Sequence, residues 1–196
     1  NEDGSMKTNE LCMIDGNLYY FRGWGGMLYN AWYQNPADGN WYYLRDWGAA
    51  LNTGWSHIGN DWYYFNPDCT MKKDELCRIG NDLYYFRGWG GMLYNAWHQD
   101  PSNGNWYYFR GWGGALNTGW SHIGNDWYYF NPDCTMKSDE FCWLDGNLYY
   151  FRGWGGRMHS SWYHDKNTGK WYLFDKEGRA YRNQKVRNGI DTYYFN

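Results

Sequence analysis

The sequence lacks any long hydrophobic run and any concentration of positive charge. Among its 196 residues there is no stretch of 18 apolar residues, which excludes a transmembrane helix. Eighteen Lys and Arg residues against 21 Asp and Glu residues give a net charge of −3 with interspersed signs. Without a basic stripe to follow a phosphate backbone, we expect no nucleic-acid partner. No leader with a cleavage site is recognisable, so we interpret the chain as a mature protein or a piece of one.

Helical periodicity and aliphatic residues are also scarce. No apolar stripe with the period of a helix extends beyond one turn, so nothing in the sequence favours helices. Aromatic residues are abundant instead, since 16 Trp, 22 Tyr and 9 Phe make up 24% of the chain, and Gly reaches 26 residues. A core built from this composition must be largely aromatic.

One short aromatic motif recurs along the chain. In seven of its nine copies it is a Trp or Leu, two Tyr residues and a Phe or Leu, as in WYYF from Trp62 to Phe65, and the last two copies read WYLF and TYYF. Successive copies are separated by 23, 21 and 21 residues in turn, so three copies make a superrepeat of 65 residues. Fixed periods of this kind are typical of solenoids. The nine copies begin at Leu18, Trp41, Trp62, Leu83, Trp106, Trp127, Leu148, Trp171 and Thr192.

Each copy predicts one strand of a short β-hairpin. Aromatic residues are favoured on pleated strands, and turn residues bound the motif, as in IGND before Trp62. Because one such hairpin cannot bury an apolar face alone, neighbours must stack. We therefore predict an all-β fold, a solenoid of about nine stacked hairpins that forms a single domain over residues 1–196. Its superrepeats cover approximately residues 1–65, 66–130 and 131–196.

Alternation along the strand divides the motif between two faces. Trp62 and Tyr64 face one way, and Tyr63 and Phe65 face the other. Because the fourth place is occupied by Phe or Leu, we assign its face to the core. The Trp and the second Tyr of the motif should then line a groove between stacked hairpins.

The five cysteines have a regular spacing of their own. Cys69 and Cys77 are eight residues apart, as are Cys134 and Cys142, and Cys12 is left over. This spacing suits a local disulfide in an exported protein, so we predict the bonds Cys69–Cys77 and Cys134–Cys142 and a free Cys12. Buried thiols in a cytosolic protein are the alternative.

Polar clusters with a catalytic or metal-binding pattern are absent from the sequence. There is no CxxC or HxxxH pair for zinc and no EF-hand spacing for calcium. His57 and His122 occupy the same place in two copies of SHIGND, which hairpin formation explains better than catalysis. We therefore expect that this segment is not an enzyme and that it uses no metal and no cofactor.

The repeating unit resembles the choline-binding repeat, also called the cell-wall-binding repeat. TGWSHIGNDWYYFNPDCTM, which starts at Thr53, matches that family's Gly-Trp, its Trp-Tyr-Tyr strand, its turn and its Met. Nine units in phase extend the resemblance over essentially the whole chain. It implies a β-hairpin solenoid that holds phosphocholine on bacterial teichoic acids, in targeting modules of cell-wall lytic enzymes and in adhesins. Similar repeats in glucan-binding enzymes and clostridial toxins bind carbohydrate instead.

The resemblance also implies the binding residues. In the family, an aromatic cage combines the Trp after Gly, the Trp of the following strand and a Tyr of the next repeat. A quaternary ammonium has no hydrogen-bond donor and is best held by such ring faces. We choose the second Tyr of the motif because it shares a face with the strand Trp, and the first Tyr is the alternative. The five cages are Trp32, Trp41 and Tyr64; Trp55, Trp62 and Tyr85; Trp97, Trp106 and Tyr129; Trp120, Trp127 and Tyr150; and Trp162, Trp171 and Tyr194.

Several repeats depart from the family's pattern. The repeats of Cys12, Cys77 and Cys142 have Cys where the first Trp is expected and Leu at the strand start, so they should lack a cage. Ala50, Ala115 and Arg157 replace the family's Met, which is present at Met27, Met71, Met92 and Met136. An additional Trp that either caps the groove or extends it toward a sugar occurs in five turns, at Trp24, Trp47, Trp89, Trp112 and Trp154.

Three functions follow from these observations. The first is an anchor, secreted or on the bacterial surface, that binds choline or phosphocholine of cell-wall teichoic acid. The second is a carbohydrate-binding module for glucan or host glycan. A structural spacer, which would bind neither ligand, is the third.

Overall fold

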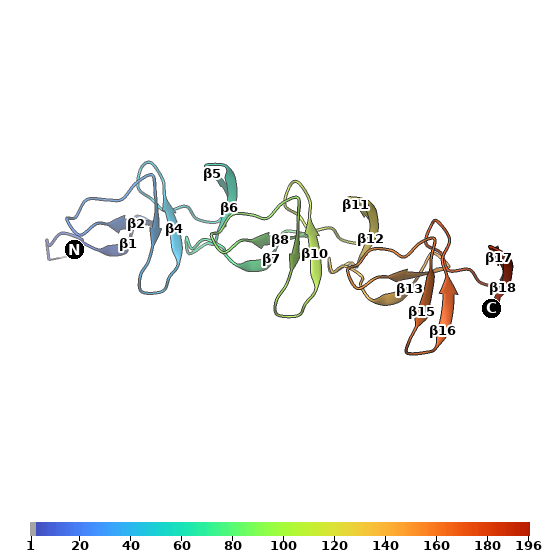
Figure 1. Cartoon of the computed structure of the whole chain (residues 1–196). Helices are drawn as coiled ribbons and strands as arrows, with labels where there is room; N and C mark the ends of the chain where they lie inside the picture. The colour runs from blue at the N-terminus through green and yellow to red at the C-terminus, as the bar shows by residue number, and fades with distance from the viewer. Residues whose placement is uncertain (1–2) are drawn as a thin grey trace. The chain divides into compact units, whose positions relative to one another are not determined.

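The computed structural model describes residues 3–196 as short strands paired into nine antiparallel hairpins (Figure 1). Residues 3–196 contain no helix, and so none that could cross a membrane. The prediction of an all-β fold built from nine hairpins is confirmed. The hairpins are β1 (Glu10–Ile14) with β2 (Asn17–Phe21), β3 (Ala31–Gln34) with β4 (Trp41–Leu44), β5 (Gly54–Ile58) with β6 (Asp61–Phe65), β7 (Glu75–Ile79) with β8 (Asp82–Phe86), β9 (Ala96–Gln99) with β10 (Trp106–Phe109), β11 (Gly119–Ile123) with β12 (Asp126–Phe130), β13 (Glu140–Leu144) with β14 (Asn147–Phe151), β15 (Trp162–Asp165) with β16 (Lys170–Leu173), and β17 (Gln184–Asn188) with β18 (Asp191–Phe195).

The hairpins belong to two compact units. One unit contains the described residues up to Asn95 together with Gly111–Gly114, and therefore the strands from β1 to β8. The other contains Ala96–Arg110 and Ala115–Asn196, with the strands from β9 to β18. Every aromatic site described below lies within one unit.

Tight turns close the hairpins where the sequence contains Asp-Gly or Gly-Asn. Between β1 and β2, Asp15 and Gly16 have φ angles of 49° and 78°, and a two-residue type I′ turn requires positive values at both places. These turns fix the strand register. On the hairpin of β5 and β6, for example, Trp55 lies opposite Tyr64.

Within each unit, a short segment that follows a hairpin bonds it to the hairpin before it. In the first unit, the backbone N–H of Met71, which follows β6, donates to the carbonyl oxygen of Trp41 on β4 at 2.9 Å. In the second unit, Met136 donates in the same way to the carbonyl oxygen of Trp106 at 2.9 Å. Because these bonds join successive hairpins, the hairpins stack within each unit, which confirms the predicted solenoid.

The fourth residue of the motif forms the core. Phe65 on β6 is 0% exposed and lies in one cluster with Tyr63 and Met71. Alternation places Tyr63 on the same face as Phe65, so the first Tyr of the motif is buried as well. The assignment of this face to the core is confirmed. The other fully buried residues in the fourth place are Leu44, Phe86, Phe109, Phe130, Phe151 and Phe174.

The turn after each hairpin matches the residue that it covers. Gly48 has φ 92°, and a Cβ added there would lie 2.4 Å from the sulfur of Met27, so this turn has room only for glycine. Cys69 occupies the equivalent turn place with φ 71°, and it packs with Ala50 instead of a Met. The Cys side chain therefore fills the volume that Met fills elsewhere.

The two disulfides predicted from the cysteine spacing are wrong. None of the five cysteines, all within residues 3–196, forms a disulfide bond. Cys69 packs in a cluster around β4, whereas Cys77, on β7, packs against a cluster around β8. A spacing of eight residues therefore joins two places that face different clusters. Cys134 and Cys142 occupy the equivalent places. Cys12 was expected to differ from the other four cysteines in forming no disulfide, but none of the five forms one.

Candidate functional site

Five hairpins carry a Trp on each strand, and the two rings meet on one face. On the hairpin of β5 and β6, Trp55 lies opposite Tyr64 and Trp62 lies opposite His57, so both Trp side chains project to the same side. Their ring centroids are 6.5 Å apart with the planes at 81°. Similar edge-to-face pairs at 6.4 to 6.5 Å are Trp32 with Trp41, Trp97 with Trp106, Trp120 with Trp127, and Trp162 with Trp171.

A ring from the next hairpin completes each pair. The centroid of Tyr84, on β8, lies 4.8 Å from that of Trp55. Tyr84 is buried, whereas Trp62 is 46% exposed, so the set of rings is open to solvent on one side. The equivalent contacts, at 4.8 to 4.9 Å, join Trp32 with Tyr63, Trp97 with Tyr128, Trp120 with Tyr149, and Trp162 with Tyr193. Each set keeps the name aromatic cage, and is identified by its first Trp.

The ring of the next hairpin that contacts the first Trp is the first Tyr of the motif, which the sequence left open as the alternative, and the choice of the second Tyr as a ligand contact stays a prediction. The second Tyr faces the same way as the Trp of its own motif, which is away from the preceding hairpin. The first Tyr points back toward the preceding Trp pair. The structure therefore joins the predicted Trp pairs and brings the first Tyr of the next motif against the first Trp of each pair. Of the tyrosines chosen from the sequence, which are Tyr64, Tyr85, Tyr129, Tyr150 and Tyr194, the last lines a pocket together with Trp171.

The second tyrosines have other places in the structure. Tyr64 lies against Trp55 of its own hairpin, with centroids 5.4 Å apart, and so belongs to the cage after the predicted one. Tyr129 stands in the same relation to Trp120 at 5.3 Å. The hydroxyl of Tyr85 donates to Asp74 at 2.9 Å. Alternation along the strand shows that the two tyrosines of a motif lie on opposite faces. It identifies the Tyr that contacts the preceding Trp pair only when the face turned toward the preceding hairpin is known.

In the hairpins of β1, β7 and β13, the residue in the place of the first Trp is the one before the predicted Cys. Leu76 on β7 lies opposite Tyr85, in the register that Trp55 has opposite Tyr64, and Cys77 follows it. Leu11 and Phe141 hold the same place on β1 and β13. These residues, and not the cysteines, therefore replace the first Trp.

The short segment that follows a hairpin and bonds it to the one before, here called the linking segment, contributes a further wall of the cage. The backbone N–H of Met92 donates to the carbonyl oxygen of Trp62 at 2.8 Å, and Met92 packs in one cluster with Tyr84, against Trp55. Met71 and Met136 hold this place at the Trp32 and Trp97 cages. Arg157 holds it at the Trp120 cage, where its N–H donates to the carbonyl oxygen of Trp127 at 2.8 Å.

Two of the cages open into pockets. A pocket of about 630 Å³ at the Trp55 cage is lined by its three rings, by Met92 and by the turn residue Trp112. A second pocket, of about 480 Å³, is lined by Trp97, Trp106, Tyr128, Met136, Gly153 and Trp154. Both are within the range of small-molecule sites.

The cage tyrosines of these two pockets remain uncharged at neutral pH. Burial, followed by the nearby Asp82 and Asp126, raises the pKa of Tyr84 and of Tyr128, so both phenols keep their protons. The rings of His57 and Trp62 lie 5.1 Å apart. A neutral aromatic surface attracts a cation through the ring faces and requires no hydrogen-bond donor from it.

The turn tryptophans stack against arginines and reach the cages from the side. The guanidinium of Arg87 lies 5.4 Å from the ring of Trp89, and Trp89 approaches Tyr63 of the Trp32 cage at 6.1 Å. Trp112 and Trp154 approach the cage tyrosines Tyr84 and Tyr128 at 6.1 Å. Trp89 is 51% exposed, so these turns extend the cages with flat apolar surface.

Within residues 3–196 there is no group of three or more His, Cys, Asp or Glu side chains that could hold a metal ion.

Comparison with known families identifies the repeats. The profile of the choline-binding repeat matches residues 52–97 and 117–163. The profile of the putative cell wall binding repeat matches residues 30–50, 95–115 and 160–180. A search of curated proteins found no match.

Solved structures from Streptococcus pneumoniae are similar to this chain. The modular autolysin LytC, in complex with a synthetic peptidoglycan ligand, is 28% identical with a TM-score of 0.68, over 99% of this chain and 48% of that one. Choline binding protein F is 26% identical with a TM-score of 0.70, over 90% and 58%. The choline-binding domain of CbpL is 26% identical with a TM-score of 0.65, over 91% and 100%. The chain thus spans about half the length of the first two proteins. From its repeats, its stacked hairpins and these matches, the chain belongs to the family of choline-binding, or cell-wall-binding, repeat proteins.

Proposed function

We propose that the chain is a non-catalytic binding module that attaches a bacterial surface or secreted protein to phosphocholine on cell-wall teichoic acid. The observation that carries this proposal is the recurrence of the same cage, two Trp rings and a Tyr from the next hairpin, at five places. We further propose that residues 1–196 act as one binding domain of three superrepeats, because the cages keep the 65-residue period.

The chemistry of the cage suits a quaternary ammonium. The methyl groups of this cation donate no hydrogen bonds, and each ring face contributes roughly 0.5 to 2 kcal/mol. Three rings then give about 2 to 6 kcal/mol before the cost of association, which corresponds to millimolar affinity at best for one cage.

Repetition raises the affinity for a polymer. When one choline of a polymer is bound, the others are held near the remaining cages at a high effective concentration. Several weak cages therefore hold a choline-bearing polymer firmly. The similarity to the autolysin LytC and to the choline-binding domain of CbpL supports a targeting role outside the cell.

Titration with choline chloride tests the proposal. Saturating choline should change Trp fluorescence with a millimolar midpoint and raise the thermal unfolding midpoint, because only the folded chain has the cages. Ethanolamine, which lacks the methyl groups, should compete poorly. Unchanged fluorescence and unchanged thermal stability at saturating choline would refute the choline function.

Carbohydrate binding is the second candidate, and the turn tryptophans favour it. Trp112 and Trp154 line the two pockets beside the cages and offer flat surfaces on which a sugar ring can stack. A dextran or starch oligosaccharide that raises the thermal midpoint, under conditions where choline does not, would favour this function over the first.

A further inference from the structure

Two cages with the same rings differ in one wall. Met92 lies at the Trp55 cage and Arg157 lies at the Trp120 cage. Their backbones are placed alike, since the N–H of each donates at 2.8 Å to the carbonyl oxygen of the strand Trp, Trp62 or Trp127. The difference between the two cages therefore lies in the side chain.

The side chain of Arg157 fills the space that Met fills elsewhere and then continues over a ring of the cage. A Cβ added at Gly178 would lie 2.6 Å from both Cδ and Nε of Arg157, just as one added at Gly113 would lie 2.2 Å from the sulfur of Met92. Beyond this point the guanidinium carbon of Arg157 lies 5.7 Å from the centroid of Trp120. That distance is within the range of a cation–π contact.

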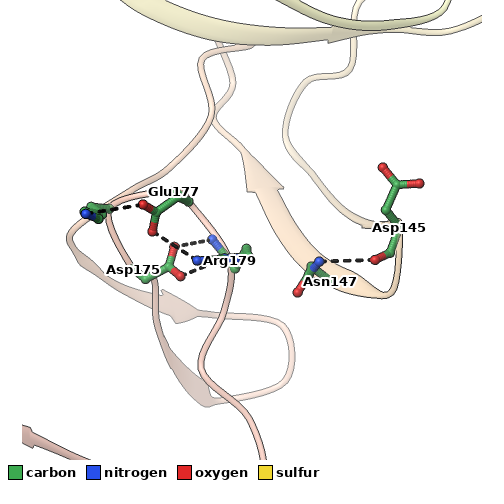
Figure 2. Close-up of polar contacts among 6 residues, drawn as sticks. Asp145, Asn147, Asp175, Glu177 and Arg179 are labelled. Carbon is green, nitrogen blue, oxygen red and sulfur yellow. Dashed lines mark hydrogen bonds and ion pairs between the residues drawn. The ribbon is translucent and has the colours of Figure 1, made fainter.

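The charge of Arg157 is not neutralised by a direct ion pair. Its Nε is buried without a hydrogen-bond partner, and no carboxylate pairs with it within the described residues. The nearby carboxylates are bonded to Arg179, which donates to Asp175 at 2.9 Å and to Glu177 at 3.1 Å, as Figure 2 shows. Burial lowers the pKa of Arg157, but a guanidinium remains protonated in proteins.

We infer that Arg157 is a built-in cation of the Trp120 cage and closes this cage to quaternary ammonium ligands. The inference rests on the proposed choline function. A choline bound among Trp120, Trp127 and Tyr149 would meet a positive charge at close range, in surroundings that screen it poorly. The guanidinium cannot withdraw freely, because its stem is held under Gly178. The chain then has four choline cages out of five ring sets.

The exchange of the two wall residues tests this inference. Arg157→Met should fold normally, because Met stands in this place at Met71, Met92 and Met136. Equilibrium dialysis of the 196-residue chain with radiolabelled choline should show one more choline bound per chain in this variant than in the wild type. Met92→Arg should show one fewer. Arg157→Lys, which keeps the charge, should bind as the wild type does.

The possible results separate this inference from the proposed function. If the wild type binds choline and Arg157→Met binds no additional choline, the inference is overturned and the proposed function stands. Choline density in the Trp120 cage of a choline-soaked wild-type crystal would have the same consequence. Failure of the wild type and of all variants to bind choline overturns the proposed function and, with it, this inference. Circular dichroism of Met92→Arg verifies the fold of this variant. If Met92→Arg does not fold, the gain of one bound choline in Arg157→Met decides the test.

Discussion

The Trp55 and Trp120 cages are built from the same local sequence and have different walls. Residues 50–72 are identical to residues 115–137, and the Trp–Trp distance is 6.5 Å in both cages. Met92 and the turn residue Trp112 flank the first cage, whereas Arg157 and Glu177 hold the equivalent places at the second. The chemical character of a cage is therefore decided by the hairpins that follow the Trp pair.

The largest expected effect tests whether the two cages are packed alike. Phe86 and Phe151 are 0% exposed, and each ring lies 5.6 Å from the first Trp of its cage. Phe86→Ala and Phe151→Ala should each lower the free energy of unfolding by about 3 to 5 kcal/mol, measured by urea unfolding. A large loss in only one variant would show that the two cages differ in packing as well as in charge.

A second prediction concerns the match between the linking segment and the turn that covers it. Ala50→Met should destabilise the chain by about 1 to 3 kcal/mol, because the larger side chain meets Cys69. The double variant Ala50→Met with Cys69→Gly restores the pair seen at Met27 and Gly48 and should recover most of that loss. Urea unfolding of the single variants and the double variant measures the coupling, and additive effects would contradict the match.

The third prediction compares the two cages in choline binding. Trp62→Ala should weaken choline at its cage by roughly 0.5 to 2 kcal/mol, the contribution of one ring. Trp127→Ala removes the equivalent ring from the cage that Arg157 occupies, so choline binding should not change. Calorimetric titration of both variants checks this difference. Equal losses in the two variants would mean that the Trp120 cage also takes choline.

The smallest effect is expected from the turn tryptophans. Trp112 approaches Tyr84 of the Trp55 cage, so Trp112→Ala should cost about 0.5 to 1 kcal/mol of choline binding. Trp47→Ala is the matched control, because Trp47 approaches Tyr19 on a hairpin without a Trp pair. Choline titrations of the two variants should differ. A larger loss for an oligosaccharide than for choline in Trp112→Ala would favour the carbohydrate function.

The fold followed from the sequence because its determinants are local. The turn residues before Trp62 and the alternation of Tyr63 and Phe65 with Trp62 and Tyr64 act within a single hairpin. The regular spacing of the WYYF motif then repeats this hairpin along the chain. The same reasoning identified the Trp pairs, because a Trp pair also lies within one hairpin.

The sequence was not sufficient where the answer depends on how hairpins stack. Tyr85 was chosen over Tyr84 because the sequence does not state which face turns toward the preceding hairpin. Cys69 and Cys77 are close in sequence, but they pack into clusters that belong to different hairpins. Arg157 was visible in the sequence as a departure from Met, and its contact with Trp120 depends on the three-dimensional arrangement.

The pairing of Met with Gly and of Ala with Cys restricts how this chain can grow or shrink. Met27 lies under Gly48, Ala50 packs with Cys69, and Met71 lies under Gly90. Deleting residues 28–50 would place Met27 under Cys69, where the two side chains compete for one space. Deleting a block of 65 residues, such as 28–92, would place Met27 under Gly113 and keep every pair matched. Duplication or recombination that preserves stability should therefore keep Met under a glycine turn and Ala under a cysteine turn. A block of three hairpins always does so, whereas a single repeat does so only at some places, such as residues 72–92, whose deletion would put Met71 under Gly113.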